Sequence, residues 1–211
     1  MEKLDPIFIT GEVKFMNVKT PVGFIKGRGF VPDAPDPQYG ITLRLNDFEE
    51  LARVQALMDG LQEEAVTLLS PDLPKNVTLS TPSEKIQAEV NKAGELTGAK
   101  QVKFQAKSVF MKDGEETALR APYLFGEDGK QMDADYVQHG SKVEVKVRPR
   151  FYKMPNTMKR GEFIIGVTYR LEAVRVLKTA ERGDSAPKSA SDFGFTGEFM
   201  EPTSTESESI F

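Results

Sequence analysis

Alternation of apolar and polar residues over long stretches is the feature that most limits how this chain can fold. A period of two puts every second side chain on the same face of a strand, so each such stretch predicts a half-buried β-strand. In the last of them the alternation slips near Ala173, which predicts a bulge or a strong bend. The stretches are Ile7–Val18, Tyr39–Leu45, Lys100–Met111, Lys142–Tyr152 and Glu162–Leu177.

One segment has helical spacing instead. Asn46 or Asp47 is a suitable N-cap, and two prolines, Pro71 and Pro74, end the segment. A second, short helix is predicted over Ser83–Ala93, where an acid-led run follows a proline. The apolar residues of the long helix are Leu51, Val54, Leu57, Met58, Leu61, Ala65 and Leu68.

These elements predict a mainly β fold. Five or so curved strands, separated by wide loops, favour a small barrel over an open sheet, and a five-stranded OB-fold fits with one long and one short helix inserted. We expect this domain to span residues 1–180.

The last part of the sequence has a different composition. From Glu181 to Phe211 there are seven acidic and two basic residues, with many Gly, Ser, Thr and Pro and no period. Such a segment buries too little apolar surface to offset the entropy of ordering, so we expect residues 181–211 to form a disordered acidic tail. The net charge of −4 is therefore unevenly spread, and residues 1–180 carry a net +1.

The residue types present exclude several kinds of chemistry. The chain has no cysteine and one histidine, His139, which lies beside a glycine in a predicted turn. Disulfides, thiolate metal sites and a Ser/His/Asp arrangement are thus not predicted, and we expect no cofactor, no metal and no enzymatic activity. No stretch approaches the ~18 apolar residues of a membrane span, which predicts no membrane partner and a cytoplasmic location.

Basic and aromatic residues alternate in two of the predicted strands. Lys and Arg can follow phosphates while exposed rings stack on bases, so this combination indicates a groove for single-stranded nucleic acid. The other interpretation is that the cations form only a solvated face and that the phenylalanines belong to the core. The predicted contacts, with a basic-aromatic loop at Gly27–Phe30 included, are Lys14, Arg28, Tyr39, Arg44, Lys103, Phe104, Lys107, Arg148, Arg150, Phe151, Tyr152 and Lys153.

Four segments of the second half of the sequence carry a family resemblance. They are Gly126-Glu-Asp-Gly-Lys-Gln-Met-Asp, Gly140-Ser-Lys-Val-Glu-Val-Lys-Val, Phe151-Tyr-Lys-Met-Pro-Asn-Thr and Tyr169-Arg-Leu-Glu-Ala-Val-Arg-Val. In this order they resemble the last third of the single-stranded DNA-binding protein of T-seven-type bacteriophages. The resemblance covers roughly residues 122–178, with a looser similarity across 10–65 and a terminal Phe211.

The resemblance implies an OB-fold that coats single-stranded DNA in phage replication, recombination and repair, in the cytoplasm of the infected bacterial host. It also implies a possible homodimer and a tail that binds replication proteins such as a DNA polymerase or a helicase-primase. The family's aromatic pair falls on Tyr152 and Met154, so its second ring is absent here. The tail residues expected to bind the partner are Glu206, Glu208, Ile210 and Phe211.

Two other functions are compatible with the sequence. One is an RNA-binding OB-fold protein, because stacking and charge do not distinguish DNA from RNA. The other is a phage structural or scaffolding protein whose tail only increases solubility.

Overall fold

The computed structural model describes residues 4–32, 34–74, 77–80, 82–90, 93–112, 114–132 and 137–180. The tail predicted over residues 181–211, with Glu206, Glu208, Ile210 and Phe211, lies outside the described residues. Within the described ranges, no helix has the length and apolar character needed to cross a membrane.

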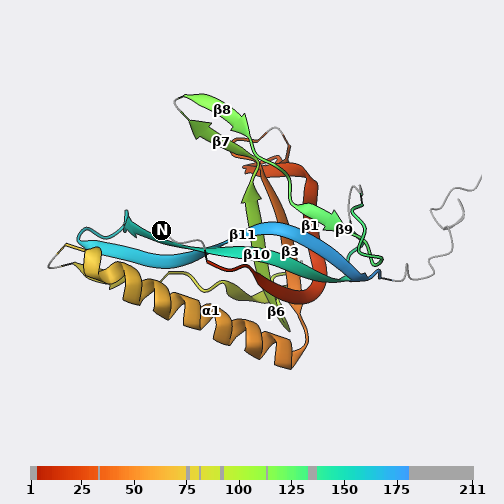
Figure 1. The fold of residues 1–211 in the computed structure, drawn as a ribbon, viewed down its shortest axis with the longest axis horizontal. Helices are drawn as coiled ribbons and strands as arrows, with labels where there is room; N and C mark the ends of the chain where they lie inside the picture. The colour runs from red at the N-terminus through yellow and green to blue at the C-terminus, as the bar shows by residue number, and fades with distance from the viewer. Residues whose placement is uncertain are drawn as a thin grey trace, which may run out of the picture. The chain divides into compact units, whose positions relative to one another are not determined.

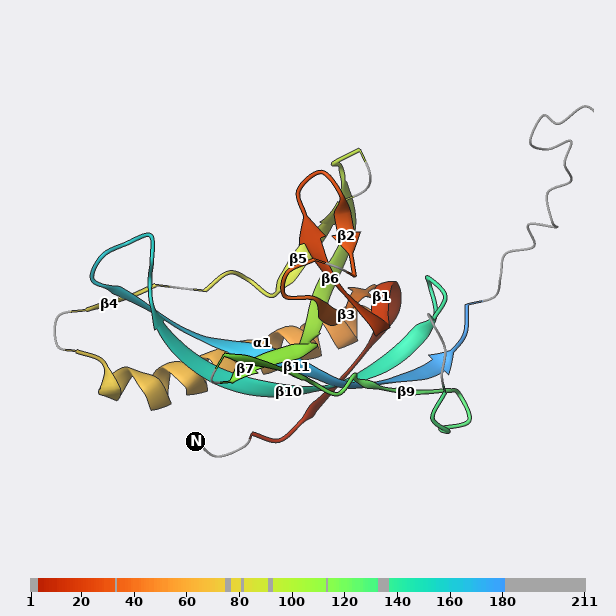
Figure 2. The same ribbon diagram turned by 90° about the horizontal axis from the view of Figure 1, so that it is seen from above.

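A closed barrel of five strands forms the centre of the described structure (Figures 1 and 2). The order around the barrel is β1–β3–β6–β11–β10 and back to β1, which is the OB arrangement. Closure depends on a parallel bridge between Arg170 of β11 and Gln105 of β6. The five strands are β1 (Ile7–Ile25), β3 (Gln38–Leu45), β6 (Leu96–Lys107), β10 (Lys142–Pro155) and β11 (Glu162–Lys178).

Shorter elements extend the barrel. β2 (Gly29–Val31) pairs with the end of β1, while β4 (Thr78–Ser80) and β9 (Tyr123–Phe125) lie parallel to different parts of β11. β7 (Val109–Lys112) and β8 (Glu115–Ala118) form a separate hairpin that projects from the barrel (Figure 1).

The alternation of apolar and polar residues corresponds to the inner and outer faces of the barrel. All five barrel strands contribute apolar residues that point inward and have almost no exposed surface. The slip near Ala173 is confirmed as a bulge, because Lys146 pairs with Ala173 and Val147 with Leu171, which leaves Glu172 as the extra residue. The fully buried core residues include Ile9, Val13, Ile41, Leu43, Val102, Phe104, Val143, Val145, Val147 and Leu171.

The long helix is confirmed as α1 (Phe48–Leu69), followed by a 3₁₀ turn at Ser70–Asp72. The Asp47 carboxylate accepts hydrogen bonds from the backbone N–H groups of Glu49 and Glu50, at 2.9 and 3.2 Å, and so caps the helix. α1 lies along β10 and β11 (Figure 1). There Ala65 joins Phe151, Ile165 and Val167 in a second cluster of buried residues.

The predicted short helix over Ser83–Ala93 is wrong. β5 (Ile86–Val90) lies within this range and pairs antiparallel with β6. Ile86 and Glu89 are buried while the two residues between them are exposed, a spacing that resembles a helix in sequence. It arises here because the register with β6 shifts between Ala88 and Val90, and pairing with the barrel overrides the local preference.

Candidate nucleic-acid interface

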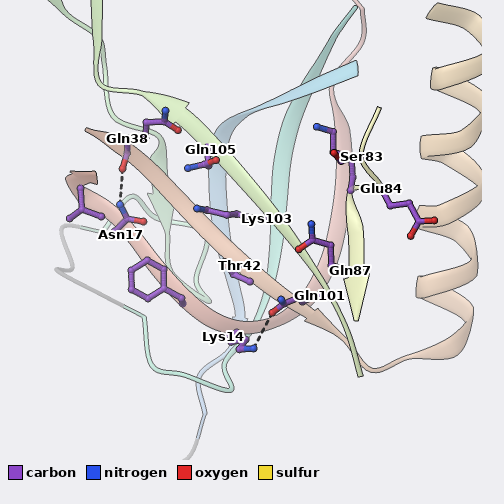
Figure 3. A pocket seen from close by; sticks show the side chains of 13 residues that line it. Lys14, Asn17, Gln38, Thr42, Ser83, Glu84, Gln87, Gln101, Lys103 and Gln105 are labelled. Atoms are coloured by element: carbon purple, nitrogen blue, oxygen red, sulfur yellow. Dashed lines mark hydrogen bonds between the residues drawn. The ribbon is translucent and has the colours of Figure 1, made fainter. Parts of the chain in front are cut away.

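The outer faces of β1, β3 and β6 form a groove with a cavity volume of about 550 Å³ (Figure 3). The half-exposed Phe15 ring and one carboxylate, that of Glu84, also line it. The polar lining consists mainly of amides and lysines: Asn17, Gln38, Gln87, Gln101, Gln105, Lys14, Lys85 and Lys103.

The register of β3 and β6 explains this lining. Gln38 pairs with Lys107 and Thr42 with Lys103, and paired residues project from the same face of a sheet. Gly40 lies between them, opposite Gln105, and adds no side chain to the outer face. The Asn17 amide donates to the Gln38 carbonyl at 2.7 Å and holds β1 against β3 (Figure 3).

A buried carboxylate on β5 holds two of the predicted DNA contacts. Both oxygens of Glu89 accept from the Arg44 guanidinium, at 2.6 and 2.7 Å, and the Lys14 ammonium lies 2.9 Å away. The Thr97 hydroxyl donates to the same carboxylate at 3.2 Å. Hydrogen bonds from Arg44, and then from Lys14, lower the pKa of Glu89 from 4.5 to about 2.

Lys14 and Arg44 therefore have a structural role in this state. Together with Glu89 they tie β1 and β3 to β5 at one end of the groove, and much of their charge is neutralised there. Lys103 and Lys107 are on the exposed face of β6. Within the described part of the chain, no ion pair includes Lys107.

A second basic surface lies on the outer face of β10 and β11. We call it the β10–β11 patch and define it by Arg148, Arg150, Tyr152 and Arg170. Arg148 pairs in register with Arg170 and Tyr152 with Gly166. A Cβ atom on Gly166 would lie 2.6 Å from the Tyr152 hydroxyl, so the phenol ring lies directly on the bare backbone. Tyr152 is partly exposed and presents a ring beside exposed Arg150.

The cations of this part of β10 differ in their partners. Arg148 donates to the Glu172 carboxylate, with the shortest distance 2.5 Å, and to the Leu4 carbonyl at 3.0 Å. These bonds fix its guanidinium at the start of the patch. Arg150 is absent from the ion pairs of the described residues. Lys153 lies 3.2 Å from Asp72, so it lies beside the end of α1 and not beside Tyr152.

Two predicted stacking residues are corrected by the structure. Phe104 is 1 % exposed and Phe151 is 6 % exposed, and both belong to the hydrophobic core. Each has the parity of the inward-facing residues of its strand, as Val102 and Val147 do. Phe151 therefore does not replace the missing second ring of the aromatic pair.

The other predicted residues take intermediate positions. Tyr39 is partly buried and packs against the core from β3. Arg28 is exposed in the turn between β1 and β2. The sequence interpretation missed Phe15 and Arg170. The alternation of polar and apolar residues could have placed Arg170 on the outer face. Phe15 has the parity of the buried Ile9 and Val13, and only the register shift between Val13 and Phe15 turns its ring outward.

In the ranges that the structure describes, no group of three or more acidic or histidine side chains is arranged to hold an ion. The lysines of the groove and the arginines of the β10–β11 patch only donate hydrogen bonds, and the amides of the groove both donate and accept, so the two surfaces offer donors to an anionic ligand.

Comparison with known proteins finds similarity at the level of structure. No protein-family model matches the chain, and no curated protein sequence matches it. The structure is similar to the crystal structure of gp2.5, a single-stranded DNA-binding protein encoded by bacteriophage T7, with a TM-score of 0.58 and 18 % identity. This match covers 95 % of this chain and 97 % of that one.

A second similar structure is the single-stranded DNA-binding protein of bacteriophage Enc34 in complex with single-stranded DNA. The TM-score is 0.52 with 14 % identity, over 83 % of this chain and 88 % of that one. At these low sequence identities, the structural similarity establishes only the fold. The chain therefore shares its fold with these two phage single-stranded DNA-binding proteins.

Proposed function

We propose that this protein binds single-stranded DNA without sequence preference, through the groove and the β10–β11 patch. The observation that carries the proposal is the bridge between Gln105 and Arg170. Gln105 lines the groove and Arg170 belongs to the patch, so the two basic surfaces meet where the barrel closes. Two solved proteins with this fold are single-stranded DNA-binding proteins, which supports the same ligand here.

The chemistry of this surface suits a single strand better than a duplex. Lysine and arginine side chains neutralise phosphates without reading bases, and Tyr152 and Phe15 offer ring faces on which any base can stack. Bases in a duplex are already stacked on each other and cannot reach these rings. The amides of the groove can donate to phosphate or base oxygens in many orientations, because their side chains rotate.

We further propose that the protein acts in phage replication, recombination and repair in the cytoplasm of the infected bacterial host. In this proposal the tail residues Glu206, Glu208, Ile210 and Phe211 recruit a DNA polymerase or a helicase-primase. An apolar pair next to acidic side chains suits a pocket that buries the phenylalanine ring and pairs the carboxylates with cations. Homodimer formation is part of the same proposal and is testable by sedimentation.

The direct test is titration of the intact protein into fluorescent oligo-dT at several salt concentrations. The logarithm of affinity should fall linearly with the logarithm of salt concentration, by about 0.7 for each phosphate contacted. Mixed-sequence DNA should bind similarly, and duplex DNA much more weakly. A flat salt response, or a strong preference for one short sequence, would contradict the proposal. Tighter binding of matched RNA would favour the RNA-binding alternative.

Single substitutions test which surface of the protein contacts DNA. Lys107→Ala and Arg150→Ala should each reduce the dependence of log affinity on log salt by the amount expected for roughly one phosphate contact. Both side chains are exposed along the proposed DNA path. Lys130→Ala is the matched control, since its side chain is 86 % exposed in a loop outside the groove and the patch. If the control lowers the slope as much as the other two, the contacts are spread over the surface and the path is wrong.

A further inference from the structure

A second cavity, of about 510 Å³, lies between β11 and the segment that leads into β9. We call it the β9 cavity. It has no part in the groove, and its lining comes from three elements that are distant in sequence. The residues that give it its chemistry are Arg120, Tyr123, Phe125, Lys146, Arg170 and Glu172.

Aromatic rings are stacked along this cavity. The rings of Tyr123 and Phe125 are nearly parallel, at 18°, with their centroids 6.1 Å apart. The Arg120 guanidinium carbon lies 4.1 Å from the centroid of Tyr123. Arg120 itself is exposed. Arg120 thus packs on the Tyr123 ring and Tyr123 stacks with Phe125; we call these three planar side chains, which include one exposed cation, the Arg120–Tyr123–Phe125 column.

Positive charge exceeds negative charge in the cavity. Arg120, Lys146 and Arg170 line it, against the single carboxylate of Glu172. That carboxylate already takes two hydrogen bonds from Arg148 and lies 3.8 Å from Lys146. Arg120 and Arg170 are outside the ion pairs of the described residues. An anion with a planar group would therefore find both charge and stacking here.

The β9 cavity adjoins the proposed DNA path through Arg170, which also belongs to the β10–β11 patch. Arg170 lines the cavity, and the residue that it bridges on β6, Gln105, lines the groove. Residues bridged in this way project from the same face of the sheet. A DNA strand that lies in the groove thus reaches the cavity by crossing the side chains of Gln105 and Arg170, and it stays on the outer face of the barrel.

We infer that single-stranded DNA continues from the groove across Arg170 into the β9 cavity, where a base stacks against the Arg120–Tyr123–Phe125 column and Lys146 and Arg170 hold the neighbouring phosphates. This inference rests on the proposed function and extends its binding site. An acidic peptide would also match the positive charge of the cavity. The stacked planar groups and the proximity to the groove favour single-stranded DNA, because its bases stack and its backbone extends from one site to the next.

The test uses the intact protein and oligo-dT from roughly 4 to 20 nucleotides, which brackets the range that one OB fold covers. Wild-type affinity should rise with length in two stages, first as the groove fills and then as the cavity fills. Tyr123→Ala and Arg120→Ala should keep the first stage and lose about tenfold in affinity for the long oligomers only. Tyr123→Phe retains the ring and should behave as wild type.

Lys178→Ala is the charge control, because Lys178 is exposed on β11 but about 26 Å from Arg170 along an extended strand. Equal loss on short and long oligomers, or no loss on either, would overturn the inference while leaving the proposed function standing. Tighter binding by Arg120→Ala at low salt would also overturn it, and would identify the acidic tail as the occupant. Failure of the wild-type protein to bind any oligomer would instead refute the proposed function.

Discussion

Glu89 has an unusual environment for a carboxylate on a candidate DNA-binding surface. It is 2 % exposed and bound by two cations that a DNA strand would otherwise use. Removing a partner from a buried charged hydrogen bond leaves the other groups unsatisfied, at a cost of roughly 1–3 kcal/mol. Its role follows from this: Glu89 stabilises the junction of β1, β3 and β5 and lowers the positive charge of the groove.

Glu89→Gln should change the pH dependence of stability. The folded-state pKa of about 2 lies below the ordinary 4.5. The stabilisation from the carboxylate is therefore complete above about pH 4.5 and is lost as the pH falls toward 2. The variant should be less stable than wild type at pH 7, by about 1–3 kcal/mol, and the difference should shrink on acidification. Urea unfolding at several pH values between 7 and 2 measures this, and a difference that is constant with pH would contradict it.

The same variant should bind DNA more tightly at low salt, provided it stays folded. Lys14 and Arg44 lose their neutralising partner and become available to phosphates, so the salt slope should increase by up to about 1.4, for two contacts. An unchanged or lower slope would show that both cations are out of reach of the strand.

Tyr152 and Phe151 are neighbours with opposite predicted behaviour. Tyr152→Ala should weaken DNA binding by about 1–3 kcal/mol and leave the salt slope nearly unchanged, because it removes stacking and no charge. Phe151→Ala should instead lower the free energy of unfolding by about 3–5 kcal/mol, because it empties a site in the core under α1. Oligo-dT titration and thermal unfolding of both variants check this, and unfolding of Tyr152→Ala would show that its ring is structural.

At the scale of elements, α1 supports the strands that carry the β10–β11 patch. Its buried face covers Phe151, Ile165 and Val167, and the Gln62 amide donates to the Ile165 carbonyl at 2.9 Å. The helix thus holds the inner face of the same strands whose outer face carries Tyr152 and Arg150. Its contribution to binding is indirect, through the shape of β10 and β11.

Asp47→Ala should destabilise the protein through this helix. The substitution leaves the N–H groups of Glu49 and Glu50 without their acceptor, at a cost of about 0.5–2 kcal/mol. Asp47→Asn keeps an acceptor at the cap and should recover most of the loss. DNA affinity of the folded variants should be unchanged at 25 °C, since the cap is outside the groove and the patch. A weaker affinity with normal stability would place this end of α1 on the DNA path.

At the scale of the whole molecule, the distribution of charge matters more than the net charge of −4. A segment rich in acidic residues that is covalently linked to a basic domain has a high effective concentration around that domain. Truncation after Ala180, whose N–H donates to the Ser141 hydroxyl, keeps the last described contact of the barrel. This truncation should raise DNA affinity at low salt, and the gain should disappear at high salt, where the charges are screened.

Removal of Phe211 alone separates the two roles predicted for the tail. DNA affinity should stay as in the intact protein, while binding to the replication partner should be lost, because the partner pocket loses its ring. Fluorescence titration and pull-down from infected cells measure the two effects. If both shortened variants match the intact protein in DNA affinity and in partner binding, the tail has neither role and serves solubility.

The sequence by itself determined the strands and the long helix. The residue types left Asn46 or Asp47 as the N-cap, and the structure shows Asp47 in that role. Alternation depends only on neighbours along the chain, so it located the five barrel strands and the bulge near Ala173. It also placed Phe104 with Val102 and Ala106 on an apolar face, which was sufficient reason to assign that ring to the core.

Only the tertiary structure decided which lysine and arginine side chains remain available to bind DNA phosphates. Arg44 and Glu89 are 45 positions apart in sequence and meet because β5 pairs with the barrel, a pairing that the local helix-like spacing concealed. The junction of the groove with the β10–β11 patch depends in the same way on the closing bridge between β6 and β11. Contacts of this kind depend on strand order and register, and a periodic pattern specifies the faces of a strand but not its neighbours.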